Sequence, residues 1–103
     1  MKRVMVRYRI KADRAAENRR FVEAVFAELR SAQPAGLRYA SFVQADGVSF
    51  VHIASVETGD GSNPLSATAA FKAFQAGIKD RCDELPVAVE LDEVGSYRIF
   101  GQG

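Results

Sequence analysis

The stretch "LRYASFVQADGVSFVHIASV", residues 37–56, contains two β-rich runs joined by Asp46-Gly47. Asp-Gly between two such runs is the strongest short-range signal for a β-hairpin. One face of the second run carries His52 together with four apolar residues: Val48, Phe50, Ala54 and Val56. Val51 and Ile53 occupy the other face. A strand with one wetted face alternates apolar and polar residues, so we expect both faces of this strand to be covered.

The residues before the hairpin predict a strand and a helix. Residues 3–10, "RVMVRYRI", alternate with period two, which is typical of a strand. After Asp13, a plausible N-cap, residues 14–32 carry apolar side chains at helical spacing and stop before Pro34. We therefore expect a strand followed by an amphipathic helix.

The residues after the hairpin predict a second helix and a last strand. Residues 65–81 repeat the helical spacing of apolar side chains, and Asn63 or Ser66 would cap this helix. Residues 87–100, which follow Pro86, predict a strand with Gly95 as a bulge or bend.

The element order is β-α-β-β-α-β, which is the ferredoxin-like arrangement of an α+β protein. In this arrangement two helices cover one face of an antiparallel four-stranded sheet, and the other face stays bare. We expect residues 1–103 to form a single domain. Because the strands of the hairpin are apolar on both faces, with Ala40 and Phe42 on the second face of the first run, something must cover the open face. The simplest cover is a second copy, so we predict a homodimer through the open sheet face.

Composition excludes several classes of function. The chain of 103 residues has a formal net charge of +1, which gives no broad attraction to nucleic acid or membrane. Its N-terminus lacks the uninterrupted apolar core of a signal peptide, and no run is apolar enough to cross a membrane. We therefore expect a cytoplasmic protein. One cysteine, Cys82, and one histidine cannot form a metal-binding cluster, and we expect no metal and no cofactor.

The RNA-recognition module has the same element order, and its third strand carries aromatic residues that stack on bases. The aligned segment here is "DGVSFVHI", residues 46–53. Asp46 stands where a cation is wanted, and Val48 and Ile53 replace aromatic residues, so Phe50 is the one ring left for stacking. The sequence does not favour RNA binding.

Three segments resemble the dimeric α/β barrel superfamily, and within it the small proteins similar to antibiotic biosynthesis monooxygenases. The segments are "VRYRIKADRAAE" (6–17), "PAGLRYASFVQADGVSFVHIASVE" (34–57) and "NPLSATAAFKAFQAGI" (63–78). The resemblance implies a homodimer with sheets face to face and, in each subunit, a pocket between sheet and helices. Activities in the superfamily include cofactor-independent oxygenation of polycyclic phenols, haem degradation, and isomerisation or cyclisation of small organic acids and polyketides.

The chain departs from the family at residues that carry function in other members. The family's third strand often ends in Glu, any residue, then Trp, and the aligned positions here are Ala54 and Val56. Where many members have a histidine near the start of the second helix, this chain offers Ser66 and Thr68. The haem-degrading activity and the phenol-oxidising activity therefore both lack expected side chains.

His52 is the candidate catalytic base, because histidine alone has an unperturbed pKa near working pH. It would act so if it opened on a cavity with an oriented partner, for which Arg7, Tyr8 and Tyr39 are candidates by position. The alternative is a partly buried neutral imidazole whose N–H meets a hydroxyl or water and which contributes to packing.

The tyrosine hydroxyls would bind a phenolic or carboxylate ligand, and the phenylalanines have the spacing of core residues. The residues predicted to contact substrate are Arg7, Tyr8, Tyr39, Phe50 and Phe74. Two functions follow: a cofactor-independent monooxygenase acting on a small aromatic or polyketide-like substrate, or a non-catalytic dimeric module that binds a small hydrophobic ligand or serves in a stress response.

Overall fold

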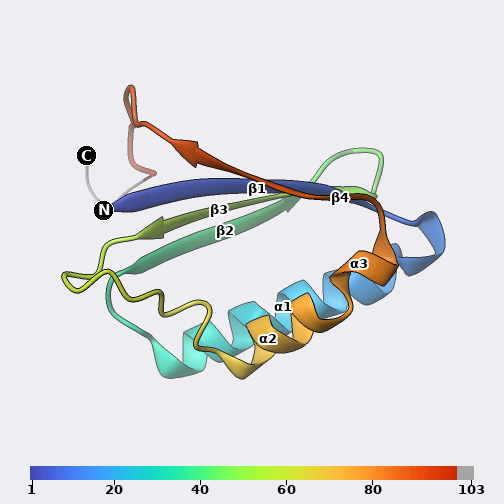
Figure 1. Cartoon of the computed structure of the whole chain (residues 1–103), viewed down its shortest axis with the longest axis horizontal. Helices are drawn as coiled ribbons and strands as arrows, with labels where there is room; N and C mark the ends of the chain where they lie inside the picture. Colours follow the sequence, from blue (N-terminus) through green and yellow to red (C-terminus); the bar gives the residue numbers. More distant parts are fainter. Residues whose placement is uncertain (100–103) are drawn as a thin grey trace.

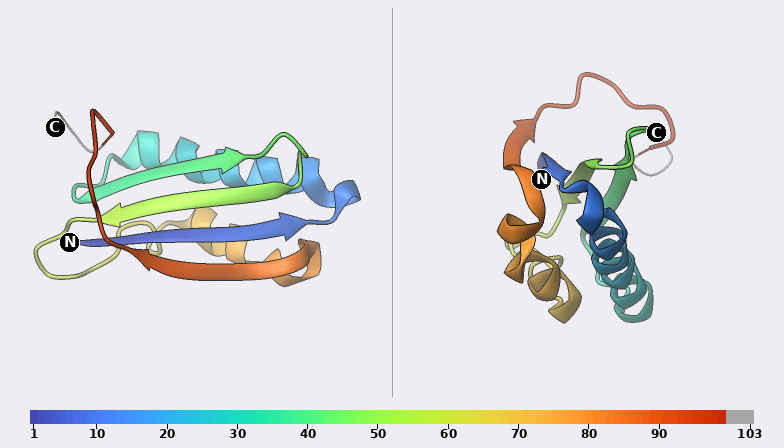
Figure 2. Two further views of the ribbon diagram at one scale, coloured as in Figure 1. Left: turned by 90° about the horizontal axis from the view of Figure 1, so that it is seen from above. Right: turned by 90° about the vertical axis from the view of Figure 1, so that its right-hand side faces the viewer.

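The computed structural model describes residues 1–99, and within them an antiparallel sheet lies on a layer of helices (Figure 1). The strands are β1 (Lys2–Ile10), β2 (Leu37–Val43), β3 (Ser49–Val56) and β4 (Cys82–Leu91). They form a 4-stranded sheet in the order β2-β3-β1-β4, and the left-hand view of Figure 2 shows the four strands side by side in this order. The predicted ferredoxin-like α+β fold is confirmed.

The Asp46-Gly47 hairpin joins β2 to β3 as predicted. Val43 pairs with Phe50, and the backbone N–H of Gln44 donates to the carbonyl of Ser49 at 2.8 Å. Gly47 has φ +76°, a left-handed conformation that glycine adopts without a steric penalty. The side chain of Asp46 closes the turn by accepting the N–H of residue 48 at 3.0 Å. Hydrogen bonds within residues 43–50 therefore form the turn.

The first helix, α1 (Ala15–Ala32), follows a short 3-10 turn, η1 (Ala12–Arg14). Asp13 lies inside that turn, so the prediction that it caps the helix is wrong. Arg14 occupies the N-cap position and makes no side-chain capping bond, although its guanidinium donates to the carboxylate of Glu17. The helix ends at Ala32. The C-cap residue Gln33 has a left-handed backbone, and its N–H donates to the carbonyl of Leu29 at 2.8 Å.

The second helical segment is shorter than predicted and is divided into α2 (Ala69–Ala76) and α3 (Ile78–Arg81), with Gly77 between them. Its cap is Thr68, not Asn63 or Ser66, because the Thr68 hydroxyl accepts the N–H of Phe71 at 3.2 Å. A second acceptor comes from α1, where the carboxylate of Glu28 receives the N–H groups of residues 69 and 70 at 3.2 and 2.8 Å. This carboxylate also stabilises the positive end of the helix dipole. The two helices are thus tied together at the start of α2.

The last strand begins at Cys82 instead of residue 87 and ends at Leu91. It forms an edge of the sheet, where the missing N–H of Pro86 is tolerated. Gly95 lies beyond the strand, so of the bulge or bend predicted there the bulge is wrong. The pairing of β4 with β1 instead shifts register between Arg7 and Arg9. Phe100, the last residue of the predicted strand, lies outside the described residues.

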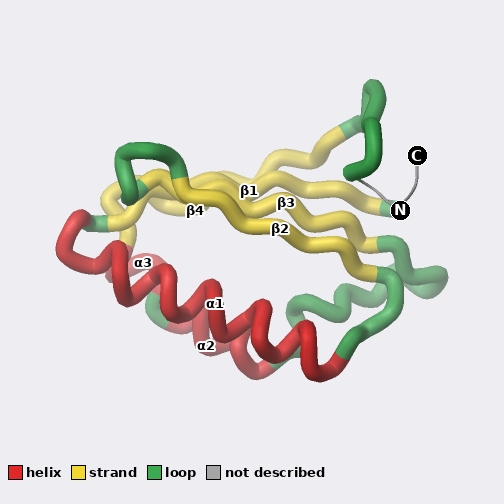
Figure 3. The backbone as a smooth tube through the Cα atoms, turned by 180° about the vertical axis from the view of Figure 1, so that it is seen from behind, coloured by secondary structure: helices red, strands yellow, loops and turns green. Residues whose placement is uncertain are grey.

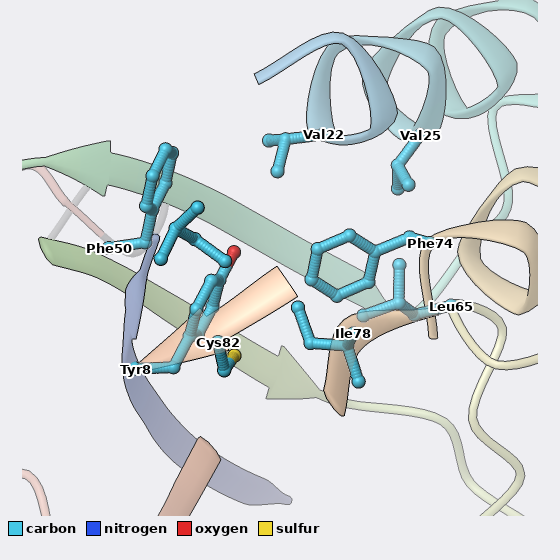
Figure 4. Packing of buried hydrophobic residues seen from close by; sticks show 9 residues of the cluster. Tyr8, Val22, Val25, Phe50, Leu65, Phe74, Ile78 and Cys82 are labelled. Atoms are coloured by element: carbon cyan, nitrogen blue, oxygen red, sulfur yellow. The ribbon is translucent and has the colours of Figure 1, made fainter. Parts of the chain in front are cut away.

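The helix-covered face of the sheet holds the core, and the opposite face is open (Figure 3). Figure 4 shows the core side chains packed between the strands and the helices. They are Tyr8, Ile10, Val22, Val25, Phe50, Leu65, Phe74, Ile78 and Cys82. The open face exposes large apolar side chains, among them Phe42 (57% exposed), Val87 (49%) and Val89 (40%). After β4 the chain arches away on this same side, as Figures 1 and 2 agree. No helix within residues 1–99 is both long and apolar enough to cross a membrane.

Replacing Gly36 with alanine is expected to destabilise the fold more than the same change at Gly47. Both residues have φ near +80°, where a side chain costs about 1–2 kcal/mol. At residue 36 the added Cβ would also lie 2.7 Å from Cγ2 of Thr58, whereas at residue 47 it meets nothing within 4 Å. Urea unfolding of both variants measures the difference, and equal losses would contradict the close contact with Thr58.

Candidate functional site

A cavity of about 480 Å³ lies between the helix-covered face of β1 and β3 and the residues of α2 with the loop before it. The lining is mostly apolar, and the residues that surround it are Val4, Val6, Tyr8, Tyr39, His52, Ala54, Val56, Leu65, Phe71, Phe74, Gln75, Ile78 and Pro86, with Met1, Lys2, Thr58, Gly61 and Asn63 at one end. Lys2, Gly61 and Asn63 are exposed, so the cavity opens at that end. His52 pairs with Val6, four residues along β1 from Lys2 at the open end, so His52 lies deeper in the cavity.

His52 lies in the cavity wall with both ring nitrogens hydrogen-bonded. Its side chain is only 4% exposed. Nε2 is 2.7 Å from the hydroxyl of Tyr8, and Nδ1 is 2.5 Å from the hydroxyl of Tyr39 and 3.0 Å from that of Ser41. Strand geometry explains this grouping, because Ser41 of β2 and Val6 of β1 are the direct neighbours of His52, and Tyr8 and Tyr39 lie two residues along the same faces.

A chain of polar groups continues from Tyr8 into the interior. The amide Nδ2 of Asn18 donates to the Tyr8 hydroxyl at 3.0 Å, and Nε of Arg81 donates to Oδ1 of Asn18 at 3.2 Å. Asn18 and Arg81 are 0% and 1% exposed. Arg81 also donates to the carbonyl of Phe74 at 2.7 Å and lies 4.4 Å from the ring centre of Phe21. Buried charge is costly unless hydrogen-bonded, and these contacts satisfy the guanidinium.

Burial sets the protonation of the cluster. Desolvation lowers the pKa of His52 to about 4, so the ring is neutral at neutral pH. Burial raises the pKa of Tyr39 to about 12 and raises that of Tyr8 as well, so both hydroxyls keep their protons. The site therefore presents neutral donors and acceptors to a ligand, with the Arg81 charge held behind them.

The structure brings together most of the residues predicted for the site. Tyr8, Tyr39, His52 and Phe74 line the cavity. Phe50 does not reach it and instead stacks behind Tyr8, with ring centres 5.5 Å apart. Arg7 is exposed on the open face of the sheet, because adjacent residues of a strand point to opposite sides, so it does not meet His52.

Three residues of the cluster were missed from the sequence: Asn18, Ser41 and Arg81. Asn18 stands four residues before Val22 on the apolar stripe of α1, and Arg81 stands three residues after Ile78 on the stripe of the second helical segment. A polar residue on an apolar stripe is a signal for a buried hydrogen-bonding role. No group of three or more His, Cys, Asp or Glu side chains within residues 1–99 is placed to hold a metal ion.

Stability is expected to fall as the pH is lowered from 7 to 5. The unfolded histidine has a pKa of about 6.5, whereas in the folded protein the pKa of His52 is about 4, so between these values only the unfolded state takes up the proton. The loss should be about 2 kcal/mol, measured by urea unfolding at several pH values.

His52→Asn is the control for this titration, because His52 is the single histidine of the chain. The variant should lose most of the pH dependence between pH 7 and pH 5. An unchanged slope in the variant would show that carboxylates, not His52, cause the loss.

Comparison with known proteins supports the fold. No family model matches the sequence, and no curated protein matches it. Among solved structures, an antibiotic biosynthesis monooxygenase superposes with a TM-score of 0.74 at 21% identity, covering 92% of this chain and 100% of that one. Rv0793 from Mycobacterium tuberculosis gives 0.74 at 16%, covering 92% and 96%. A candidate antibiotic biosynthesis monooxygenase from Nitrosomonas europaea gives 0.76 at 18%, covering 92% and 100%. The chain therefore has the same fold as these solved structures, the ferredoxin-like α+β arrangement that its sequence predicts.

Proposed function

We propose that the protein binds a small aromatic or polyketide-like molecule in the cavity and oxygenates it without a cofactor, as a monooxygenase. One observation carries the proposal: an apolar cavity of about 480 Å³ ends on an imidazole with a tyrosine hydroxyl at each ring nitrogen. Pockets of this kind, mostly apolar with a few converging polar groups, are typical of small-molecule sites. The structural neighbours named as antibiotic biosynthesis monooxygenases support the same class.

The reaction converts an activated CH2 group and O2 into a carbonyl group and water. A proton leaves the substrate carbon, and the resulting enolate gives one electron to O2, after which the two radicals form a C–O bond. The peroxide anion takes up a proton, and the hydroperoxide loses water as its remaining C–H bond and its O–O bond break. The protein's part is to favour the enolate, either with a base or with a donor at its oxygen. Within this proposal, His52 with Tyr8 and Tyr39 performs that part, and the rings of Phe71 and Phe74 hold the flat substrate.

Binding without catalysis is the second candidate function, and two observations favour it. The pKa of His52, about 4, makes it a weak base at neutral pH, and both of its ring nitrogens are already hydrogen-bonded. A module of this kind would hold the same class of ligand.

Filling the cavity is expected to abolish binding and turnover. Ala54 lines the cavity, so Ala54→Phe should remove the space for a ligand, whereas Ala24→Phe on the exposed side of α1 should change neither property. Calorimetry with anthraquinone-2-sulfonate measures binding, and O2 consumption with anthrone, above the uncatalysed rate, measures turnover.

The pattern of results separates the two functions. Turnover that is lost in Ala54→Phe and kept in Ala24→Phe supports the monooxygenase. Binding without O2 consumption supports the non-catalytic module. Turnover that survives Ala54→Phe would show that the chemistry does not take place in this cavity.

We also propose that the open sheet face pairs with the same face of a second copy. Phe42 at one edge of this face and Val87 and Val89 at the other expose 40–57% of their surface, and large apolar side chains exposed on one face favour an interaction site there. Such a contact would be isologous, the commonest arrangement in homo-oligomers.

Light scattering at micromolar concentration should give about twice the 11.3 kDa of the chain. Phe42→Asp places a charge on the open face and should yield the monomer mass, whereas Ala24→Asp on α1 should leave the dimer intact. A monomeric wild type would contradict the proposed pairing.

A further inference from the structure

We propose that the hydroxyl of Tyr39 is the hydrogen-bond donor that recognises the ligand, and that the group it binds is an acceptor oxygen: a carbonyl, quinone or phenolate oxygen. The inference rests on the proposed function of the cavity as a small-molecule site. It adds which protein atom meets the polar atom of the ligand, and it gives His52 a positioning role.

The direction of donation is set first at Arg81, because a guanidinium only donates hydrogen bonds. Its Nε lies 3.2 Å from Oδ1 of Asn18, so the carbonyl end of that amide faces Arg81. The NH2 end of the amide must then face Tyr8, as the distance of 3.0 Å from Nδ2 to the Tyr8 hydroxyl shows. If the amide were flipped, its NH2 group would face the N–H of Arg81, and neither group could accept a hydrogen bond.

Tyr8 passes this direction to His52. Its hydroxyl accepts from Asn18 and has one hydrogen of its own to donate. The acceptor within reach is Nε2 of His52, at 2.7 Å. If Nε2 carried the ring proton, the Tyr8 hydroxyl would receive two donors and its own hydrogen would have no buried acceptor, which is costly.

Neutral His52 therefore carries its proton on Nδ1. That N–H points at the Tyr39 hydroxyl, 2.5 Å away, with Ser41 at 3.0 Å. The Tyr39 hydroxyl therefore accepts the hydrogen bond from His52. The hydroxyl hydrogen of Tyr39 is left to donate elsewhere, and Tyr39 lines the cavity.

This arrangement suits an oxygen on which negative charge develops. Each donor in a hydrogen-bond chain polarises the next, so Tyr39 is a stronger donor than an isolated tyrosine. A donor aimed at the oxygen of an enolate or phenolate stabilises that anion without taking up a proton. His52 then acts through Tyr39 and is not the group that removes the substrate proton.

The ring proton can be located by two-bond 1H–15N correlation on the 15N-labelled full chain at pH 7 and pH 8. His52 is the single histidine, so its signals need no assignment. We expect a protonated Nδ1 and an unprotonated Nε2 in the wild type. Tyr8→Phe, which removes the donor to Nε2, should shift the proton toward Nε2, and Tyr97→Phe, an exposed tyrosine outside the cavity, should not. A wild-type Nε2 that carries the proton would overturn the inference.

The role of Tyr39 is tested with two probes that differ in their carbonyl groups: anthraquinone-2-sulfonate and anthracene-2-sulfonate. The wild type and Tyr97→Phe should bind the quinone roughly three- to ten-fold more tightly, the range expected for one hydrogen bond. Tyr39→Phe should bind the two probes equally.

The outcomes separate this inference from the proposed function. Equal binding of both probes by the wild type, or preference for the quinone that survives in Tyr39→Phe, would overturn the role of Tyr39 while leaving the cavity a ligand site. If the wild type binds neither probe, both the proposed ligand class and the proposed contact between Tyr39 and an acceptor oxygen are contradicted. The nitrogen signals would still show which ring nitrogen of His52 carries the proton.

Discussion

The buried guanidinium of Arg81 is the constraint on which the polar interior depends. It carries a charge that it cannot lose, it is 1% exposed, and no carboxylate within residues 1–99 lies at ion-pair distance from it. Removing such a charge from water costs several kcal/mol, so its hydrogen bonds to Asn18 and to the carbonyl of Phe74 are obligatory. The backbone makes room for it, because a Cβ at Gly77 would lie 3.1 Å from its Nη1.

Beyond Arg81 the polar groups are neutral, and what passes from one to the next is the donor-to-acceptor direction of their hydrogen bonds. Asn18 of α1 connects Arg81 of α3 to Tyr8 of β1, and His52 of β3 connects Tyr8 to Tyr39 of β2. One hydrogen-bond chain thus links two helices with three strands. The apolar rings around it, Phe50 and Phe74 against Tyr8, exclude water from the chain. The cavity thus has a rigid polar end and an apolar remainder, which favours one orientation of a bound molecule.

Local patterns in the sequence predict the fold well, because hairpin chemistry and period-two alternation act over a few residues. They predict β1, the Asp46-Gly47 hairpin and the apolar open face. They fail at β4, where an edge strand accepts Pro86 in its interior, and at the helix cap, where Glu28 from another helix contributes. They also fail for the polar chain, since the contact between Asn18 and Arg81 joins residues 63 positions apart. The wrong placement of Arg7 in the site was avoidable, because Arg7 and Tyr8 are adjacent in β1 and their side chains must lie on opposite faces of the sheet.

The edge formed by β4 decides how two such sheets can meet. Pro86 has no N–H to offer a neighbouring strand, and the register shift opposite Arg7 and Arg9 twists the edge, so β4 is poorly suited to extend the sheet into another molecule. Contact through the open face would instead depend on removing apolar side chains from water. Apolar attraction of this kind weakens on cooling, whereas backbone hydrogen bonding between edges would not share that signature. Pairing through the open face, as proposed, would therefore weaken on cooling, because Pro86 and the register shift leave β4 unsuited to edge-to-edge pairing.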